Sequence, residues 1–412
     1  MTMGSDPGAV PLVRPPTLRS DETRSATRLE LFFDLAYVLA VGALAANLLE
    51  DVNWGGVGEF AFLLVLIWLS WVQFTLYNNR FDTDDLVLRL GKFAATAAVL
   101  GCAASMSDAV GDLSTAFAAS YLTGRVVLVL LYARAWRHVH EARETIDVYL
   151  VSMSVVAALW AVSLAVPAPA RFVLWGVGAL VDVAAPIIAT RRSATAPLHL
   201  EHLPERFALL VILVLGEVAA AVVAGLHETH WAARSALIAG AGFVVAAAAW
   251  WAYFDVSAAV STDALERAEA VAEAEEQAND AQEGDTGEDE VEKVDERHDL
   301  FVYGHLPVTG GLLAAGVGLE ELVIHPTDPL PSAGSWLLAG GLAVFLAGAA
   351  LILGGTERRL GRALRWPGVG VVVMVGLGAL GPRDALAFGA AAAVLLAGIA
   401  AVGTALSRRH EA

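Results

Sequence analysis

The chain has 412 residues, of which 57% are hydrophobic and 17% charged, and its mean hydropathy is +0.60. Soluble domains are nearer half apolar and a quarter charged, so this composition excludes an ordinary soluble protein. The net charge of −18 says little about a ligand, because 16 acidic and 3 basic residues between Asp263 and Asp299 supply −13 of it. The single cysteine, Cys102, excludes an intramolecular disulfide.

Apolar blocks recur along the whole chain and are separated by short polar gaps. Each block approaches the length of about 20 helical residues that crosses a hydrocarbon core. We therefore predict an all-α polytopic membrane protein. Its twelve predicted helices are 29–49, 58–77, 90–107, 113–133, 146–166, 171–189, 205–225, 232–256, 299–324, 336–354, 367–381 and 384–406.

The basic residues favour one set of gaps between these helices. Of the 26 Lys and Arg residues, 22 lie in alternate gaps and the two tails, three lie in the other gaps, and Arg125 lies within a helix. Loops with an excess of Lys and Arg face the cytoplasm. We therefore expect both termini in the cytoplasm.

The gaps also divide the chain into segments. The stretch 257–298 is long, highly charged and poor in apolar residues, which predicts a largely disordered cytoplasmic loop. The other predicted segments are a flexible cytoplasmic tail at 1–28, a first six-helix half at 29–189, the start of the second half at 190–256, helices nine to twelve at 299–406, and a cytoplasmic tail at 407–412.

Two pairs of residues indicate an internal repeat. Asp34 in the first helix precedes Trp71 by 37 residues, and Glu217 in the seventh helix precedes Trp251 by 34 residues. Six helices in each half would make the repeats parallel, related by an axis along the membrane normal. We therefore consider a duplication of six helices.

Ionisable residues inside the predicted helices are candidates for a functional site, because a charge in the bilayer is costly unless it is paired or hydrated. Glu30 and Asp34 are four residues apart in "RLELFFDLAYVLA" and share one helix face. A carboxyl group at this depth can accept a proton near neutral pH or serve as the structural partner of a base. Both interpretations stay open for this pair.

The second candidate group lies along the seventh helix. His202, Arg206 and Glu217 fall on one stripe of "HLPERFALLVILVLGE", which places Glu217 near the middle of the bilayer. Gly216 beside it would allow a second backbone to approach closely. The spacing of His202 and Glu205 also admits a metal site, but the intervening proline and the lack of further ligands favour a helix entry instead.

The remaining buried charges are Arg125 and Asp182. An arginine in the middle of the membrane requires an acidic partner, and Asp34, Asp182 and Glu217 all qualify. A structural salt bridge is the simpler interpretation. In the polar loop "YNNRFDTDD", an aspartate is expected to cap the third helix.

Six segments together resemble the bacterial low-temperature-requirement protein A (LtrA) family. They are "LELFFDL" at 29–35, "NRFDTDD" at 79–85, Asp182 in "LVDVAAP", "HLPERFALLVILVLGE" at 202–217, "WWAYFD" at 250–255 and "HLP" at 305–307. Val218 departs from the serine that commonly follows the glutamate. The resemblance implies a many-helix bacterial membrane protein named for a growth defect in the cold, and it implies no substrate.

The buried carboxylates favour a transporter or permease coupled to protons or cations, in which Asp34 and Glu217 bind the ion and Glu30 and Arg206 tune them. Two alternatives stay open. Arg28, Phe32 and Asp34 resemble the first-helix signature of six-helix-repeat potassium channels, which favours a cation channel. A membrane-embedded enzyme or sensor with a role in cold growth is the other, although the chain carries no nucleophile pair or phosphate-binding loop.

The expected partners follow from this class of protein. We expect contact with the lipid bilayer of the bacterial cell membrane and with a small ion or small-molecule substrate. We expect no nucleic acid, no metal and no cofactor. The oligomeric state, a homo-oligomer included, stays open.

Overall fold

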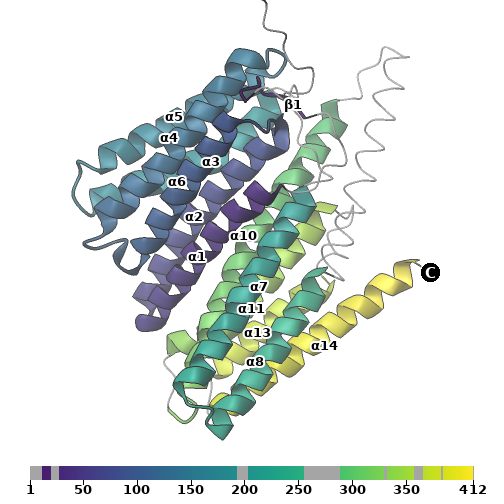
Figure 1. The fold of residues 1–412 in the computed structure, drawn as a ribbon. Coiled ribbons are helices and arrows are strands. Elements are labelled where there is room, and N and C mark those ends of the chain that lie inside the picture. The colour runs from purple at the N-terminus through teal and green to yellow at the C-terminus, as the bar shows by residue number, and fades with distance from the viewer. Residues whose placement is uncertain are drawn as a thin grey trace, which may run out of the picture. The chain divides into compact units, whose positions relative to one another are not determined.

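The computed structural model describes residues 12–19, 27–192, 203–254, 288–328, 332–356, 365–381 and 384–411 (Figure 1). The predicted stretch 257–287, most of the acidic loop, lies outside these residues. The helices of the described residues are α1 (Arg28–Glu50), α2 (Trp54–Arg80), α3 (Leu86–Ala104), α4 (Ser114–His138), α5 (Arg143–Ser163), α6 (Ala170–Arg192), α7 (Leu203–Glu228), α8 (Ala233–Trp251), α10 (Glu288–Ile324), α11 (Ser332–Thr356), α13 (Arg365–Leu380) and α14 (Ala385–Glu411).

These twelve helices confirm the prediction of an all-α polytopic membrane protein. Eleven of them, within the described residues, are long and apolar enough to cross a membrane. The twelfth, α13, has 16 residues, fewer than the ~20 that a hydrocarbon core requires. The largest difference from the predicted bounds is in α10, which begins at Glu288 instead of residue 299.

The helix ends follow from local capping. Thr27 and Glu30 form a reciprocal capping box at the start of α1, in which the Thr27 amide donates to the Glu30 carboxylate and the Glu30 amide donates to the Thr27 hydroxyl, both at 3.2 Å. At α3 the carboxylate of Asp85 accepts from the amide of Leu88 at 3.0 Å. This confirms the aspartate cap expected in the loop before α3.

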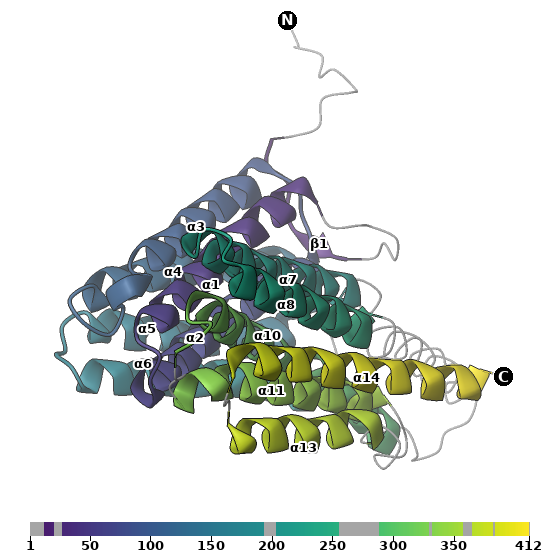
Figure 2. The same cartoon turned by 90° about the horizontal axis from the view of Figure 1, so that it is seen from below.

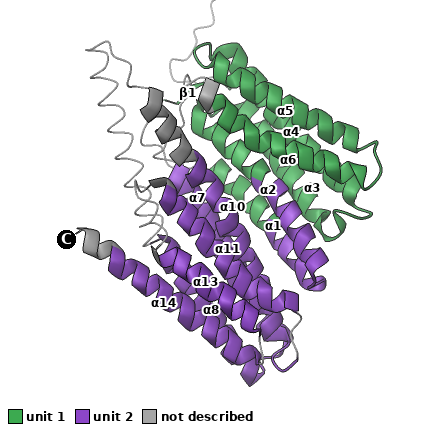
Figure 3. Ribbon diagram, turned by 180° about the vertical axis from the view of Figure 1, so that it is seen from behind, with its two compact units in different colours: residues 1–40, 69–199 green, residues 41–68, 200–412 purple. Residues whose placement is uncertain are grey.

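The described chain divides into two compact units (Figure 3). Unit 1 comprises Met1–Ala40 and Leu69–His199, and unit 2 comprises Val41–Trp68 and Leu200–Ala412. The chain passes between the units within α1 and again within α2. Each unit therefore contains half of each of these two helices.

In unit 1 the helices α3 to α6 pack in chain order, each against the next. Aromatic rings fill the space between α4, α5 and α6. Tyr121 stacks on Trp160 with ring centroids 3.8 Å apart, and Trp160 stacks on Trp175 at 4.8 Å. Such rings bury large apolar areas and fix the spacing of the helices.

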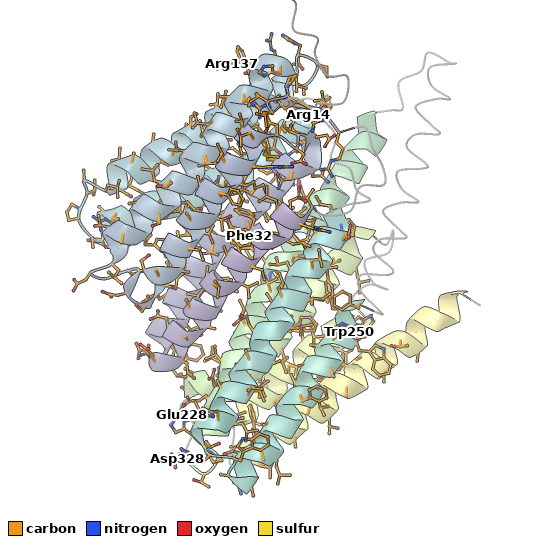
Figure 4. The ribbon with its side chains drawn as sticks, in the orientation of Figure 1. Arg14, Phe32, Arg137, Glu228, Trp250 and Asp328 are labelled. Carbon is orange, nitrogen blue, oxygen red and sulfur yellow. The ribbon has the colours of Figure 1, made fainter. Side chains whose placement is uncertain are left out.

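A short segment before α1 is held against unit 1. Strand β1 (Thr17–Leu18) pairs antiparallel with β2 (Phe81–Asp82), which lies between α2 and α3. We call residues 12–19 the amino-terminal strap. Figure 4 places Arg14 of the strap and Arg137 at the end of α4 at the same end of unit 1. The strap lies within the cytoplasmic tail expected at 1–28, of which residues 1–11 and 20–26 lie outside the described residues.

The centre of unit 2 is the pair α10 and α11, which also contacts α7 and α13. Glycines allow the two backbones to meet: a Cβ on Gly341 of α11 would lie 2.7 Å from the amide nitrogen of Ala315 and 2.7 Å from the carbonyl oxygen of Gly311 on α10. Contact at this distance excludes any side chain. Around this pair, α14 packs against α8 and α13, as Figure 2 shows.

Candidate functional site

The most deeply buried Asp, Lys and Arg side chains among the described residues of unit 1 are four. Asp34 on α1, Lys92 on α3, Arg125 on α4 and Asp182 on α6 are each at most 2% exposed. All four belong to helices that are apolar enough to span a membrane. Because two are acids and two are bases, their formal charges cancel. We call these four residues the buried charge set.

Asp34 is held by a neighbour on α2. The indole Nε1 of Trp71 donates to its Oδ1 at 2.9 Å, and both side chains are buried. Tyr37, one turn further along α1, shares a hydrogen bond of 2.9 Å with Ser70 on α2. These contacts position the carboxyl group predicted at this helix. Trp251, which the proposed repeat pairs with Glu217, is 45% exposed, and the duplication itself stays a prediction.

Arg125 is paired with Asp182, one of its three predicted partners. Two guanidinium nitrogens contact the two carboxylate oxygens, one of them at 3.1 Å. The second nitrogen also donates to the hydroxyl of Tyr121. A forked contact of this kind is the strongest geometry for an arginine and a carboxylate.

A proline leaves the backbone carbonyl of Asp182 without its usual helical hydrogen bond. Pro186 lies inside α6 and has no N–H, so the carbonyl oxygen of Asp182, four residues earlier, has no helical donor from it. The Nε2 of Gln73 on α2 donates to this carbonyl at 3.2 Å. The polar contact replaces the lost backbone bond inside the membrane, where water cannot do so.

Lys92 was missed as a site residue by the sequence reasoning, which counted it among the loop cations. Its ammonium lies 4.4 Å from the ring centroid of Phe33 and 5.8 Å from that of Phe74. The available signal was helical spacing, because Lys92 shares its buried stripe with Ala95, Thr96 and Val99. α3 begins four residues earlier than predicted, so Lys92 lies six residues from its start instead of two.

The two predicted tuning residues lie near the starts of their helices. Glu30 is committed to the capping box with Thr27 and lies one turn before Asp34. Arg206 is buried in the first turns of α7, whereas Glu205 beside it is exposed. His202 lies outside the described residues, and among the described residues no three His, Cys, Asp or Glu side chains form a group that would hold a metal.

Glu217 lies in unit 2 and is half-buried. A Cβ on Gly42 of α1 would lie 2.7 Å from its Oε2, so the carboxylate rests against the backbone at that glycine. The close approach predicted at Gly216 is wrong for the described residues, since none of their atoms lies within 4 Å of a Cβ built there. The glycine that makes room for Glu217 is on the neighbouring helix.

Unit 2 also contains a buried histidine. His305 on α10 contacts the hydroxyl of Tyr253 through Nε2 at 2.8 Å and the carbonyl oxygen of Phe301 through Nδ1 at 2.6 Å. A carbonyl only accepts, so Nδ1 carries a hydrogen, and in the tautomer with this single hydrogen Nε2 accepts from the hydroxyl of Tyr253. The ring of Phe207 lies 4.5 Å away. Both ring nitrogens of His305 therefore have a hydrogen-bond partner, and the contact with Tyr253 is structural.

At one end of unit 1, Asp85 joins the strap to α3 and α4. Its carboxylate accepts from Arg134 at 2.6 Å and from the amide of Arg14 at 3.1 Å. Burial alone would raise the pKa of Asp85, but the hydrogen bonds from Arg134, Leu88 and Arg14 outweigh it, so the pKa is lowered below its ordinary value. The ionised carboxylate therefore holds the strap in place.

In unit 2, charged residues lie near the ends of the helices. Figure 4 shows Glu228 and Asp328 close to each other at one end of unit 2 and Trp250 toward the other. Arg234 pairs with Asp384 and donates from Nε to the carbonyl of Pro326 at 2.9 Å. These contacts tie the start of α8 to neighbouring helix ends.

Comparison with known proteins places the chain in one family. Residues 25–406 match the model of the bacterial low temperature requirement A protein (LtrA). The chain is also similar to an uncharacterized protein of Rhizobium meliloti (strain 1021), with 26% identity over 337 residues, 80% of this chain and 77% of the relative. No solved structure matches. The family match covers nearly all of the membrane-spanning helices, and the chain therefore belongs to the bacterial low temperature requirement A (LtrA) family.

Proposed function

We propose that this protein is a transporter of the bacterial cell membrane coupled to protons or cations, with its ion site at Asp34. The observation that carries the proposal is the buried charge set, four ionisable side chains that are almost fully enclosed in apolar helices of one unit. Residues of this kind are rare in membranes and mark ion pathways, proton relays or pairs that gate them.

The depths of the four residues support a pathway. Asp34 and Lys92 each lie six residues from the start of their helix, about 9 Å along its axis. Asp182 lies ten residues from the end of α6, and Arg125 thirteen from the end of α4, about 15 Å and 20 Å. If successive helices alternate in direction, these ends share one membrane face, and the charges run from that face to mid-membrane.

We propose that this face is cytoplasmic and that both termini lie there. The support is the 22 basic residues in the alternate gaps and tails against three in the others. The strap and the end of α4 carry several of these arginines at one end of unit 1 (Figure 4). Asp34 would then meet ions from the cytoplasm before the Arg125 and Asp182 pair.

Glu217 is the second carboxylate of the proposal. It is half-buried in a spanning helix and rests against the glycine backbone of α1, so a change in its protonation would be felt by that helix. Glu30 and Arg206 would tune these carboxylates, and the carboxylate of Glu30 also caps α1. The proposal therefore names one fully buried carboxylate in unit 1 and one half-buried carboxylate in unit 2, and each is tested by itself.

The test is ion flux in proteoliposomes that contain a pH-sensitive dye and are placed in Na⁺ or K⁺ gradients. Asp34→Asn keeps an acceptor for Trp71 but removes the charge, and we expect it to abolish cation-driven or proton movement. Glu217→Gln tests the second carboxylate. Asp51→Asn is the matched control, because Asp51 is exposed in the loop after α1 and the flux should stay native.

Two results would contradict the proposal. Native protein that moves neither protons nor cations in any gradient would exclude ion-coupled transport with these ions. Native flux in Asp34→Asn would remove Asp34 from the pathway. Conduction far above the turnover of a carrier would favour the channel alternative instead.

A further inference from the structure

The charges of the buried set divide into two pairs. Arg125 and Asp182 are matched by two contacts between the guanidinium and the carboxylate. The remaining members are Asp34 and Lys92, which carry opposite formal charges in the same unit. Because an uncompensated charge in a bilayer costs several kcal/mol, we take these two as mutual counter-charges.

The ammonium of Lys92 lies over two rings that are close in the chain to Asp34 and to its hydrogen-bond donor. Phe33, whose ring lies 4.4 Å from the ammonium, directly precedes Asp34 on α1. Phe74, at 5.8 Å, lies one turn after Trp71, which donates to Asp34. The two phenyl rings meet edge to face at 5.0 Å. The aromatic rings and the carboxylate thus belong to one layer of α1 and α2.

The two bases of the set differ in chemistry. A guanidinium stays charged in proteins and matches a carboxylate by its rigid fork, which suits a permanent pair. A lysine ammonium is a single charge on a flexible stem that gives up its proton when desolvated. Tyr37, Tyr121 and Cys102 are other buried titratable side chains of unit 1, and none of them is a base. Lys92 is therefore the exchangeable cation among them.

The rings that hold Lys92 are not specific to lysine. The faces of Phe side chains attract any compact cation within about 6 Å, and a neighbouring carboxylate adds a counter-charge. A monovalent cation that entered this layer would meet the same rings and the same carboxylate. With the ammonium still charged, however, the unit would hold one uncompensated positive charge.

We propose that Lys92 exchanges its proton for a monovalent substrate cation at Asp34, so that one cation enters the site for each proton released. This rests on the proposed transport function. Before exchange the site holds a carboxylate and an ammonium, and afterwards it holds a carboxylate, the bound cation and a neutral amine, with the proton released. The net charge is zero in both states, so transport is electroneutral at one cation per proton.

The test uses the full chain in proteoliposomes with Na⁺ or K⁺ gradients, a pH dye inside and a potential-sensitive dye. We expect the native protein to convert a cation gradient into a pH change without a membrane potential. Lys92→Met should lose the pH change, and cation uptake should then generate a potential. Arg89→Met removes an exposed positive charge from the same helix and should behave as native.

The outcomes separate this inference from the proposed function. A cation-driven pH change retained in Lys92→Met overturns the role of Lys92 while transport stands. Native protein that moves no ion defeats the proposed function and the inference together. If Lys92→Met does not fold, Lys92→Arg decides, because a guanidinium keeps its proton and the pH change should be lost. A native pH change in Lys92→Arg overturns the inference.

Discussion

The pairing of Arg125 with Asp182 leads to a prediction about stability. Asp182→Asn removes the charge of one partner and leaves the guanidinium of Arg125 buried without its counter-charge. Removal of one member of a buried pair costs about 3–5 kcal/mol, or roughly two to three and a half orders of magnitude in the folding equilibrium constant. Replacement of both residues by apolar ones of similar volume is often neutral, because neither charge is then left in the membrane.

A double-mutant cycle in detergent micelles measures this coupling. The four proteins are the native chain, Asp182→Asn, Arg125→Met and the double variant, and the free energy of unfolding is measured for each. We expect both single variants to be strongly destabilised and the double variant to recover most of the loss. If each single change costs less than about 1 kcal/mol, or if the costs simply add, the pair does not carry the charge balance of unit 1.

Three further predictions concern other contacts. Gly341→Ala should cost about 1–3 kcal/mol of unfolding free energy in detergent, because its Cβ would meet the α10 backbone. Gly376→Ala should be nearly neutral, because no atom of the described residues lies within 4 Å of a Cβ built there. The pKa of Asp85 is lowered in the fold, so this carboxylate stabilises the protein fully above pH 3.8, its ordinary pKa, and the stabilisation is lost as the pH falls further. Thermal unfolding of Asp85→Asn should lack this acid dependence. The same acid dependence in the variant and the native protein would contradict the prediction. Trp71→Phe removes a donor to Asp34 and should lower stability by about 1–3 kcal/mol while it slows proton-coupled flux, and native values in both assays would refute this.

Hydropathy located each of the helices, because a bilayer imposes the same apolar length on every span. It could not find the start of α10. The residues between Glu288 and Asp299 are mostly charged, so they lie outside the apolar block although Glu and Lys are good helix formers. Hydropathy reports where lipid begins, and the helix continues beyond that point.

The candidate site was only partly predictable for a different reason. Asp34, Arg125 and Asp182 stand out because each is a charge in an apolar run. The partner of Arg125 is decided by the fold, because Asp182 lies 57 residues away in the chain. Lys92 lies near a helix end, where a basic residue normally marks a loop. The burial of the Lys92 ammonium becomes evident only in the fold, where it lies over the ring of Phe33.

The strap has a consequence for the biogenesis of the protein. Its contact with Asp85 is completed by Arg134, which also donates to the backbone of Arg14, 120 residues earlier in the chain. A ribosome delivers residues 12–19 first, and domains generally form from the amino end during synthesis. The pairing of β1 with β2 can form once residue 82 has emerged, but the contacts from Arg134 require the last turn of α4. Full protection of the strap from added protease would therefore mark the completion of α4, and not the insertion of the first helix.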